Sequence, residues 1–202
     1  MKVDMHTHLL VGEGSVSPEA AELAERWGVG AEAMKVTPET HWEKTAQYTD
    51  KTIVFGGRFS GSRQIIDDRY IADYVAQHPD TLVGFMSIDP VLDTVEDIEY
   101  KYYDLHLKGI KTSTFYCNTG LADERFAPIF AAAERLGLPM IFHLGPAFPK
   151  HCFSKYGDPK PLEGIALRYP KLKIIIAHMG YPYEYELLHI VRRYPNLFVD
   201  MS

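Results

Sequence analysis

Seven short runs of apolar and β-branched residues recur along the chain, and longer segments with helical features separate them. The runs cover residues 2–6, 52–55, 81–88, 109–112, 139–143, 173–178 and 197–201. Some of them are apolar almost without interruption, as residues 174–177 illustrate, and this pattern is typical of strands in a parallel sheet that is covered on both faces. The pattern therefore predicts seven buried, parallel strands.

The intervening segments show where helices begin and end. Ser17 and Thr37 each precede a proline, which places a capping hydroxyl just ahead of a proline at the first helical position. Gly28 and Gly137 follow helical runs, at the position where glycine commonly ends a helix. Strands and helices that alternate along the whole chain predict an α/β fold, a TIM-type (β/α)8 barrel with seven of its strands present.

No linker or change in composition divides the chain, so we predict a single barrel domain over residues 1–202. Residues 9–51 are far longer than a usual strand-to-helix loop, and they contain both proline-initiated helices. We interpret this segment as a helical insert after the first strand, and we expect it to cover the pocket.

Composition and charge narrow the function. Hydrophobic residues make up 46% of the 202 residues, which is enough for one substantial core. A net charge of −6 without a Lys/Arg cluster argues against binding to nucleic acid. The chain has no run of about eighteen apolar residues and no signal-like start. We expect a cytoplasmic protein that acts on a small molecule, with no nucleic-acid or membrane partner, and a homo-oligomer remains open.

Four of the nine histidines stand at or near the ends of predicted strands. His6 and His8 are two residues apart, so on a strand their side chains point to the same face. His143 and His178 each close a strand. Because the carboxyl ends of barrel strands meet at one rim, the four imidazoles should come together there. Neutral imidazoles are good ligands for zinc, manganese or iron, so the pattern predicts a metal centre.

Several motifs taken together resemble the amidohydrolase superfamily, and specifically its amidohydrolase-2 branch. They are Asp-x-His-x-His at residues 4–8, Ser-Ile-Asp-Pro at 87–90, Gly-Ile-Lys at 109–111, the two later histidine-ended strands, and Asn-Leu-Phe-Val-Asp-Met-Ser at 196–202. That branch includes aminocarboxymuconate semialdehyde decarboxylase and pyrone dicarboxylate lactonase. The resemblance covers essentially the whole chain, in order.

The resemblance implies roles for individual residues. His6, His8 and His143 match the metal ligands of the family, and His178 matches the histidine that acts on the substrate or on the metal-bound water. One divalent metal is implied, most often zinc, with manganese or iron as alternatives. Asp4 lies two residues before His6, on the same face of the strand, and we expect it to orient one of the ligands.

The implied function is that of a metal-dependent enzyme. It would hydrolyse a C–O or C–N bond, or decarboxylate a small cyclic or unsaturated carboxylic acid. Arg58, and in the same loop Arg63, are candidates for binding a substrate carboxylate. TatD-like DNases and PHP-type phosphoesterases also begin with His-x-His, but the acidic middle-strand ligands of the first and the Ser-Asp-Gly of the second are missing from this sequence.

One expected residue has no counterpart in the sequence. The resemblance implies an aspartate at the end of an eighth strand, and the sequence stops at Ser202. Three interpretations follow: the sequence is a C-terminally incomplete fragment, Asp200 takes the place of that aspartate, or a shortened barrel without catalysis binds a small acid or a partner protein and is completed by another subunit. Lys111 could be structural, or it could be carboxylated and bridge two metals, and we favour a site with one metal.

Overall fold

The structure, a computed structural model, describes residues 1–11, 16, 18–28, 30, 34–61, 66–145, 147 and 149–202. All of its strand pairs are parallel. The strands are β1 (Val3–His8), β2 (Lys51–Phe55), β3 (Leu82–Gly84), β4 (Met86–Ser87), β5 (Ile110–Ser113), β6 (Met140–His143), β7 (Ile174–Ile176) and β8 (Leu197–Val199). Each of the seven predicted runs overlaps a strand, and the third run is divided into β3 and β4.

The strands form two sheets, with the orders β1-β2-β3 and β4-β5-β6-β7-β8. Phe85 joins them: its N–H donates to the carbonyl of Val54 in β2 at 3.0 Å, whereas the N–H of Met86 donates to the carbonyl of Gly109, just before β5, at 2.9 Å. β3 and β4 are therefore two halves of one strand that changes partners. Within the described residues, β1 and β8 have no strand paired on their outer side.

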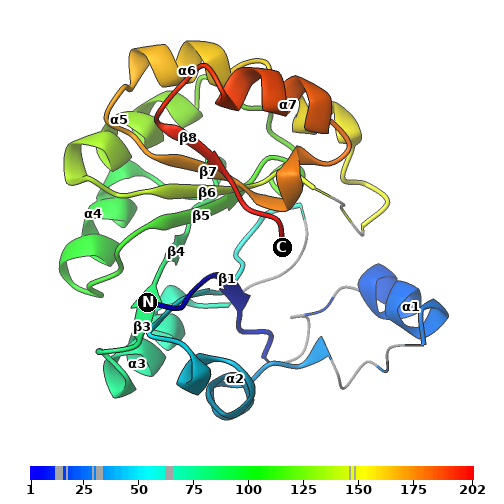
Figure 1. The fold of residues 1–202 in the computed structure, drawn as a ribbon, viewed down its shortest axis with the longest axis vertical. Helices are drawn as coiled ribbons and strands as arrows, with labels where there is room; N and C mark the ends of the chain where they lie inside the picture. Colours follow the sequence, from blue (N-terminus) through cyan, green and yellow to red (C-terminus); the bar gives the residue numbers. More distant parts are fainter. Residues whose placement is uncertain are drawn as a thin grey trace.

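The helices lie along the outer side of the strands, except the first, which lies apart from them (Figure 1). They are α1 (Pro18–Arg26), α2 (Pro38–Lys44), α3 (Asp68–Gln77), α4 (Val95–Tyr103), α5 (Phe126–Leu136), α6 (Leu162–Arg168) and α7 (Glu184–Val191), with short 3-10 helices η2 (Ala46–Tyr48), η3 (Ser154–Gly157) and η4 (Ala177–Gly180). None of the helices that the structure describes is long and apolar enough to cross a membrane.

Two of the predicted helix signals are visible in the structure. Thr37 caps α2 in a capping box with Thr40, and Pro38 begins the helix. Gly137 ends α5 with φ of 68°, a left-handed conformation that glycine adopts without steric cost. α1 begins at Pro18, and its predicted cap, Ser17, lies outside the described residues.

The core has two layers. Phe55, Phe85, Ile141, Ile175 and Ala177 form an inner cluster. A larger cluster packs the strands against the surrounding helices. Because these side chains fill the space between the strands, the interior is a packed core and not a pore.

The α2 part of the segment 9–51 lies on the outer face of the barrel, so it does not cover the rim as predicted. His41 of α2 is buried against Tyr74 of α3 and against Thr7, whose side chain points away from the barrel interior. The ring of Trp42 stacks on His78 with centroids 3.6 Å apart. α2 is held there by these contacts with Tyr74 of α3 and with His78, which follows α3.

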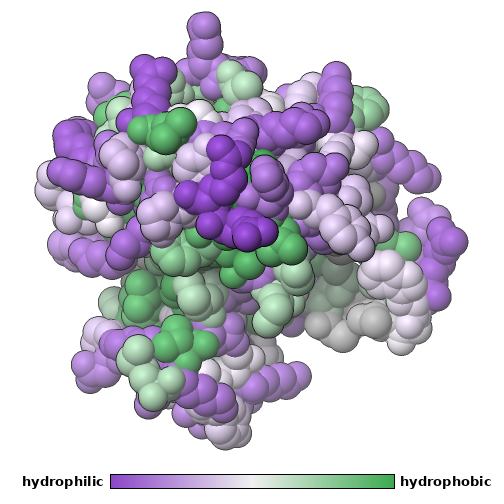
Figure 2. Space-filling model, turned by 45° about the horizontal axis from the view of Figure 1, so that its top comes forward, coloured by the Kyte–Doolittle hydropathy of each residue, from purple (hydrophilic) through white to green (hydrophobic). Residues whose placement is uncertain are grey.

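The unpaired edges of β1 and β8 border a cavity of about 450 Å³. Val3 and Met5 of β1 are each 41% exposed, and Phe198 and Val199 of β8 are 45% and 42% exposed. Figure 2 shows hydrophobic side chains gathered in a band on one face of the molecule, between more polar regions. Part of the exposed apolar surface thus lies along the unpaired edges of β1 and β8.

Candidate active site at the barrel rim

The structure brings the four predicted histidines to one rim as two pairs. The Nε2 atoms of His6 and His8 lie 3.1 Å apart. The Nδ1 atom of His143, at the end of β6, lies 3.0 Å from Nε2 of His178, which follows β7 in η4. The ring of His6 lies 5.1 Å from that of His178, centroid to centroid, so the two pairs are neighbours.

Asp200 orients the ring of His6. Its Oδ2 accepts a hydrogen bond from Nδ1 of His6 at 2.8 Å. Burial lowers the pKa of His6, and burial lowers the pKa of His8 well below its usual value, so both rings are neutral near pH 7. A carboxylate can only accept, so the single ring proton of His6 is on Nδ1 and its Nε2 carries a lone pair.

Asp200 is ionised in spite of its partial burial. Burial acts to raise the pKa of Asp200, but hydrogen bonds from His6 and Ser202 hold that pKa well below its usual range. Its other oxygen, Oδ1, accepts from the hydroxyl of Ser202 at 2.6 Å and from the main-chain N–H of His178 at 3.3 Å. One carboxylate therefore contacts residues of both histidine pairs.

Asp4, which we expected to orient a ligand ring, does not contact one. Its Oδ1 accepts from the main-chain N–H of His6 at 3.2 Å. The carboxylate that contacts the ring of His6 is instead that of Asp200, which follows β8. Asp200 was visible in the sequence only as a possible acidic ligand, because the motif after the last strand does not indicate how closely that strand approaches β1.

Hydrogen bonds also fix the second pair. The Nδ1 of His178 donates to the main-chain oxygen of Ser202 at 2.7 Å, so a neutral His178 carries its lone pair on Nε2 and accepts from Nδ1 of His143. The lone pair of a neutral His143 is then on its Nε2. Gly145 permits this arrangement, since a Cβ atom there would lie 2.5 Å from Cδ2 of His178.

The backbone at His178 is in the left-handed region, with φ of 56° there and 52° at Met179. Side-chain residues adopt this conformation at a cost of about 1–2 kcal/mol each. Asp200 holds the turn, because its carbonyl accepts from the N–H of Met179 at 2.9 Å. Such strain is characteristic of functional positions, where the surrounding structure over-determines a side chain's direction.

Lys111 of β5 lies beside the first pair. Its Nζ is 3.0 Å from Nε2 of His6 and 4.5 Å from the ring centroid of Phe55. The side chain is buried, and burial lowers the pKa of Lys111 to about 7. The structural role favoured from sequence is therefore incomplete, since this amine directly contacts a predicted ligand.

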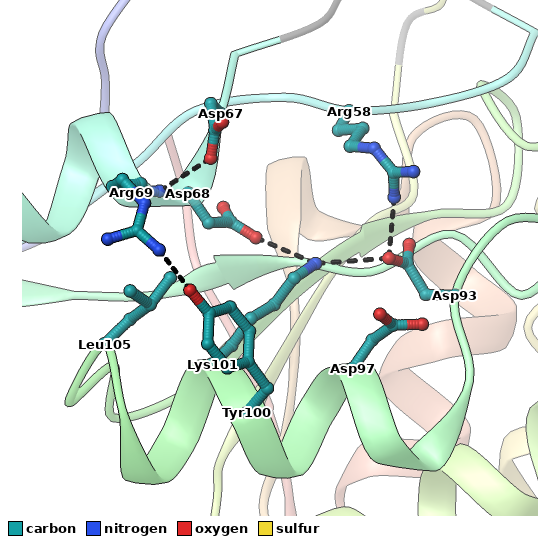
Figure 3. A pocket seen from close by; sticks show the side chains of 9 residues that line it. All are labelled: Arg58, Asp67, Asp68, Arg69, Asp93, Asp97, Tyr100, Lys101 and Leu105. Atoms are coloured by element: carbon teal, nitrogen blue, oxygen red, sulfur yellow. Dashed lines mark hydrogen bonds and ion pairs between the residues drawn. The ribbon is translucent and has the colours of Figure 1, made fainter.

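Arg58, our candidate for binding a substrate carboxylate, binds a carboxylate of the protein. Its Nη1 donates to Oδ1 of Asp93 at 2.6 Å. It lines a separate cavity of about 310 Å³ together with residues of α3 and α4 (Figure 3). The prediction for Arg58 is thus not met by its placement here, because a surface loop in a sequence does not show which neighbouring carboxylate it will meet. Arg63 lies outside the described residues.

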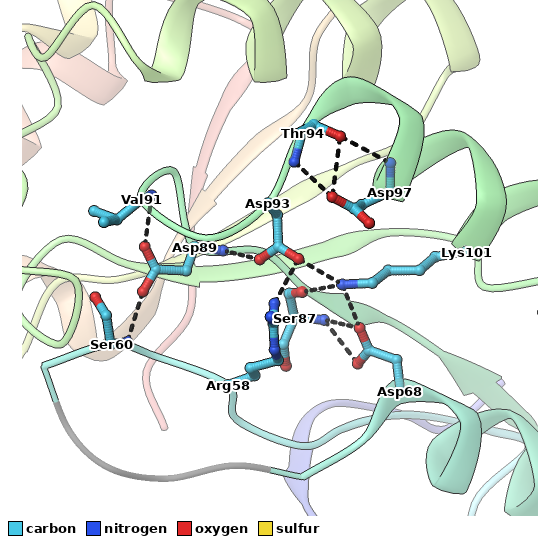
Figure 4. A network of polar contacts seen from close by, with 10 residues as sticks. All are labelled: Arg58, Ser60, Asp68, Ser87, Asp89, Val91, Asp93, Thr94, Asp97 and Lys101. Atoms are coloured by element: carbon cyan, nitrogen blue, oxygen red, sulfur yellow. Dashed lines mark hydrogen bonds and ion pairs between the residues drawn. The ribbon is translucent and has the colours of Figure 1, made fainter.

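The network around Arg58 is almost fully paired (Figure 4). Lys101 Nζ lies 3.0 Å from Asp68 Oδ2 and 3.2 Å from Asp93 Oδ1. Asp68 also accepts from the N–H of Ser87 at 2.9 Å. Burial raises the pKa of Asp68 to about 6, although the nearby Lys101 opposes the shift. These charged groups bind one another.

The His6–His8 pair has the geometry of two ligands of one ion. Two nitrogens bound about 2.0–2.1 Å from a zinc ion at a tetrahedral angle lie about 3.4 Å apart, close to the 3.1 Å between these atoms. Across the part of the chain that the structure describes, no group of three or more His, Cys, Asp or Glu side chains is gathered closely enough to hold an ion. The fit to a metal ion therefore rests on the spacing of this pair alone.

Comparison with known sequences gives a family. Residues 3–202 match the family model described as Amidohydrolase. A dihydroorotase of Helicobacter pylori is 28% identical over 103 residues, which are 50% of this chain and 29% of that protein. The chain thus spans less than a third of the length of this curated relative.

Solved structures with the same fold match all or nearly all of the chain. A TIM-barrel protein of Bordetella bronchiseptica has a TM-score of 0.78 at 18% identity, covering 100% of this chain and 75% of that one. 5-Carboxyvanillate decarboxylase of Sphingomonas paucimobilis has a TM-score of 0.68 at 17% identity, covering 100% of this chain and 80% of that one. The 5-carboxyvanillate decarboxylase of Novosphingobium aromaticivorans complexed with manganese has a TM-score of 0.61 at 18% identity, covering 96% of this chain and 69% of that one. These similarities establish the fold, a TIM-type barrel.

Proposed function

Because the chain belongs to the amidohydrolase family, whose enzymes generally bind a divalent metal, we propose that it is a metal-dependent enzyme acting on a small carboxylic acid. The reaction is hydrolysis of a C–O or C–N bond, or decarboxylation of a cyclic or unsaturated acid. The observation that carries the proposal is the pair of neutral imidazole nitrogens of His6 and His8.

In this proposal His6 and His8 hold the ion, and His143 contributes its Nε2 from the neighbouring pair. A divalent ion at this place would polarise a substrate oxygen and activate water. Zinc is our first choice, and the manganese complex of the similar decarboxylase supports manganese as the alternative. Asp200 keeps the proton of His6 on Nδ1, so that Nε2 keeps the lone pair that an ion would bind in place of the Lys111 amine.

His178 is the residue that moves a proton. Its ring bridges His143 and Ser202, and it can accept a proton at one ring nitrogen and release one from the other without changing place. The strained backbone and the close approach of Gly145 fix the direction of this ring beside His143. His178 serves hydrolysis and decarboxylation equally, because both need a group that delivers or accepts a proton.

An apolar wall beside His143 suits a flat, cyclic substrate. Phe59, Tyr116 and Cys117 form a small buried cluster, and the ring of Tyr116 stacks on His143 with centroids 4.9 Å apart. Apolar walls exclude water and strengthen the interactions of the few polar groups in a site. The decarboxylases among the similar structures support loss of a carboxyl group, and the family description supports hydrolysis.

Metal content and activity together test the proposal. The chain is loaded with zinc or manganese, freed of excess metal, and analysed for bound ion, and the loaded protein is then screened against lactones and aromatic or unsaturated carboxylic acids. We expect about one ion per chain in the wild type and almost none in the double variant His6→Ala/His8→Ala, because both ligand nitrogens are removed.

The matched control is His189→Ala, which removes an exposed imidazole of α7 far along the chain from the pair. It should keep its full metal content. Undiminished metal in the double variant would overturn the assignment of the site. Stoichiometric metal without turnover of any acid or lactone would instead favour a barrel that binds small acids without converting them.

A further inference from the structure

β1 is irregular just where it carries the histidine pair. Asp4 is in register with Thr52 and Thr7 with Val54, so three steps along β1 match two along β2. Such a bulge leaves one residue unpaired and redirects the neighbouring side chains. The direction of His6 is therefore not fixed by a regular hydrogen-bond ladder, and another interaction has to fix it.

Thr7 lies between the two histidines and points to the opposite face of the strand. Its hydroxyl donates to the carbonyl of Ile53 in β2 at 2.7 Å. Since a hydroxyl has one proton, the same oxygen must accept from Nε2 of His41, which lies 2.8 Å away. Nδ1 of His41 then accepts from the hydroxyl of Tyr74 at 2.8 Å.

This chain of hydrogen bonds has one arrangement. Thr7 is 9% exposed, His41 3% and Tyr74 2%, so water does not compete for these groups. Burial lowers the pKa of His41, although the charge of Asp4 opposes the shift, and burial raises the pKa of Tyr74 to about 12. Both side chains are neutral near pH 7, and each bond runs in a single direction from Tyr74 to the carbonyl of Ile53.

We propose that His41 is a positioning residue for the metal pair: through Thr7, it locks the bulged segment of β1 so that His6 and His8 point at the same place. His41 contacts neither imidazole and belongs to α2, on the outer face of the barrel. α2 and α3 thus act on the rim through the strand. The inference rests on the proposed function for its metal readout, but its geometric half does not.

A pair of substitutions at one position tests the proposal. The amide nitrogen of glutamine can occupy the place of Nε2 in histidine and donate to Thr7, whereas the shorter asparagine amide overlaps Nδ1 and falls short of Thr7. Metal affinity is measured by competition with a chelator. We expect His41→Asn and Thr7→Val to bind zinc about tenfold more weakly than wild type, and His41→Gln to recover most of the affinity.

Ring nitrogen chemical shifts of His6 and His8, recorded by NMR on the metal-free chain, give a second readout that a merely structural role would leave alone. They should shift in Thr7→Val and in His41→Asn, and stay near wild type in His41→Gln. Equal affinity and equal shifts for the asparagine and glutamine variants would overturn the proposal, as would wild-type values in Thr7→Val.

The two proposals fail in different ways. If the wild type binds no metal, the proposed function is wrong, and the ring shifts alone decide whether His41 positions the pair. If the wild type binds metal and all three variants match it in affinity and ring shifts, the site assignment stands and the role of His41 is wrong. Thermal unfolding of each variant shows that the measured chains are folded.

Discussion

The histidine cluster at the rim and the ion-pair network around Lys101 are both buried or half-buried, and they differ in the charge and the partners of their groups. At the rim, burial keeps the imidazoles of His6 and His8 neutral, and Lys111, whose pKa is lowered to about 7, lies beside them. In the second cluster, Lys101 and Arg58 are matched by Asp68 and Asp93 within the protein. Burial of polar groups therefore does not by itself indicate chemistry; neutral nitrogens that a metal ion could bind do.

The paired cluster joins separate parts of the chain. Arg58 comes from the loop after β2, Asp68 from α3, Asp93 from the loop after β4 and Lys101 from α4. Asp89 extends the network by accepting from the N–H of Ser60 at 2.6 Å. The difference between the clusters predicts that substitutions in the Lys101 network lower stability, whereas substitutions at the rim lower metal affinity.

The largest effect on stability should come from Lys101→Met. Removing this ammonium leaves Asp68 and Asp93 with an uncompensated buried charge, which costs about 3–5 kcal/mol. Urea unfolding measures the loss. Arg135→Ala, which breaks an exposed ion pair with Glu99, should cost less than about 1 kcal/mol. A folded Lys101→Met chain that keeps its stability but loses its metal would reverse the comparison.

A smaller effect concerns pH. The pKa of Asp68 rises on folding from 3.8 to about 6, so the protonated carboxyl is favoured in the folded state. Its contribution to stability is fully present below about pH 4 and is lost as pH rises through about 6. A shift of about two units corresponds to about 3 kcal/mol.

Asp68→Asn isolates this contribution, because asparagine resembles the neutral carboxyl at every pH. The free energy of unfolding of the wild type, relative to the variant, should fall by up to about 3 kcal/mol between pH 4 and pH 6. Denaturant unfolding across that range gives the difference directly. Parallel pH profiles for the two proteins would show that Asp68 is ionised throughout.

The smallest effect is expected at the rim. Asp200→Asn removes the charge that holds the proton on Nδ1 of His6, and loss of such a supporting carboxylate typically weakens metal binding 10–100-fold, or about 1.4–2.8 kcal/mol. Asp4→Asn is the matched control, since Asp4 contacts only the main chain of His6. The comparison predicts near wild-type affinity for the control. Similar losses in both variants would mean that general charge matters and ring orientation does not.

The sequence predicted what local patterns determine. Apolar runs located the strands, and because strand ends define one rim, His143 and His178 could be placed beside His6 over a long sequence separation. The partners of individual side chains could not be predicted, because they depend on packing. Asp200 reaches His6 only through the curvature of the sheet. Likewise, nothing local to His41 reveals the bulge in β1 that its hydrogen bonds secure.

At Phe85 one strand changes partners and so joins the two sheets. On one side, the backbone itself carries the curve from the small sheet to the large one. On the other side, where no strands pair among the described residues, the hydrogen bond between Asp200 and His6 links the end of β8 to β1. His6 and His8 belong to β1, whereas His143 ends β6 and His178 follows β7 in the large sheet. Loss of this hydrogen bond would therefore remove a direct link between the two histidine pairs. The same hydrogen bond therefore connects the unpaired edges of the two sheets and holds the two histidine pairs together.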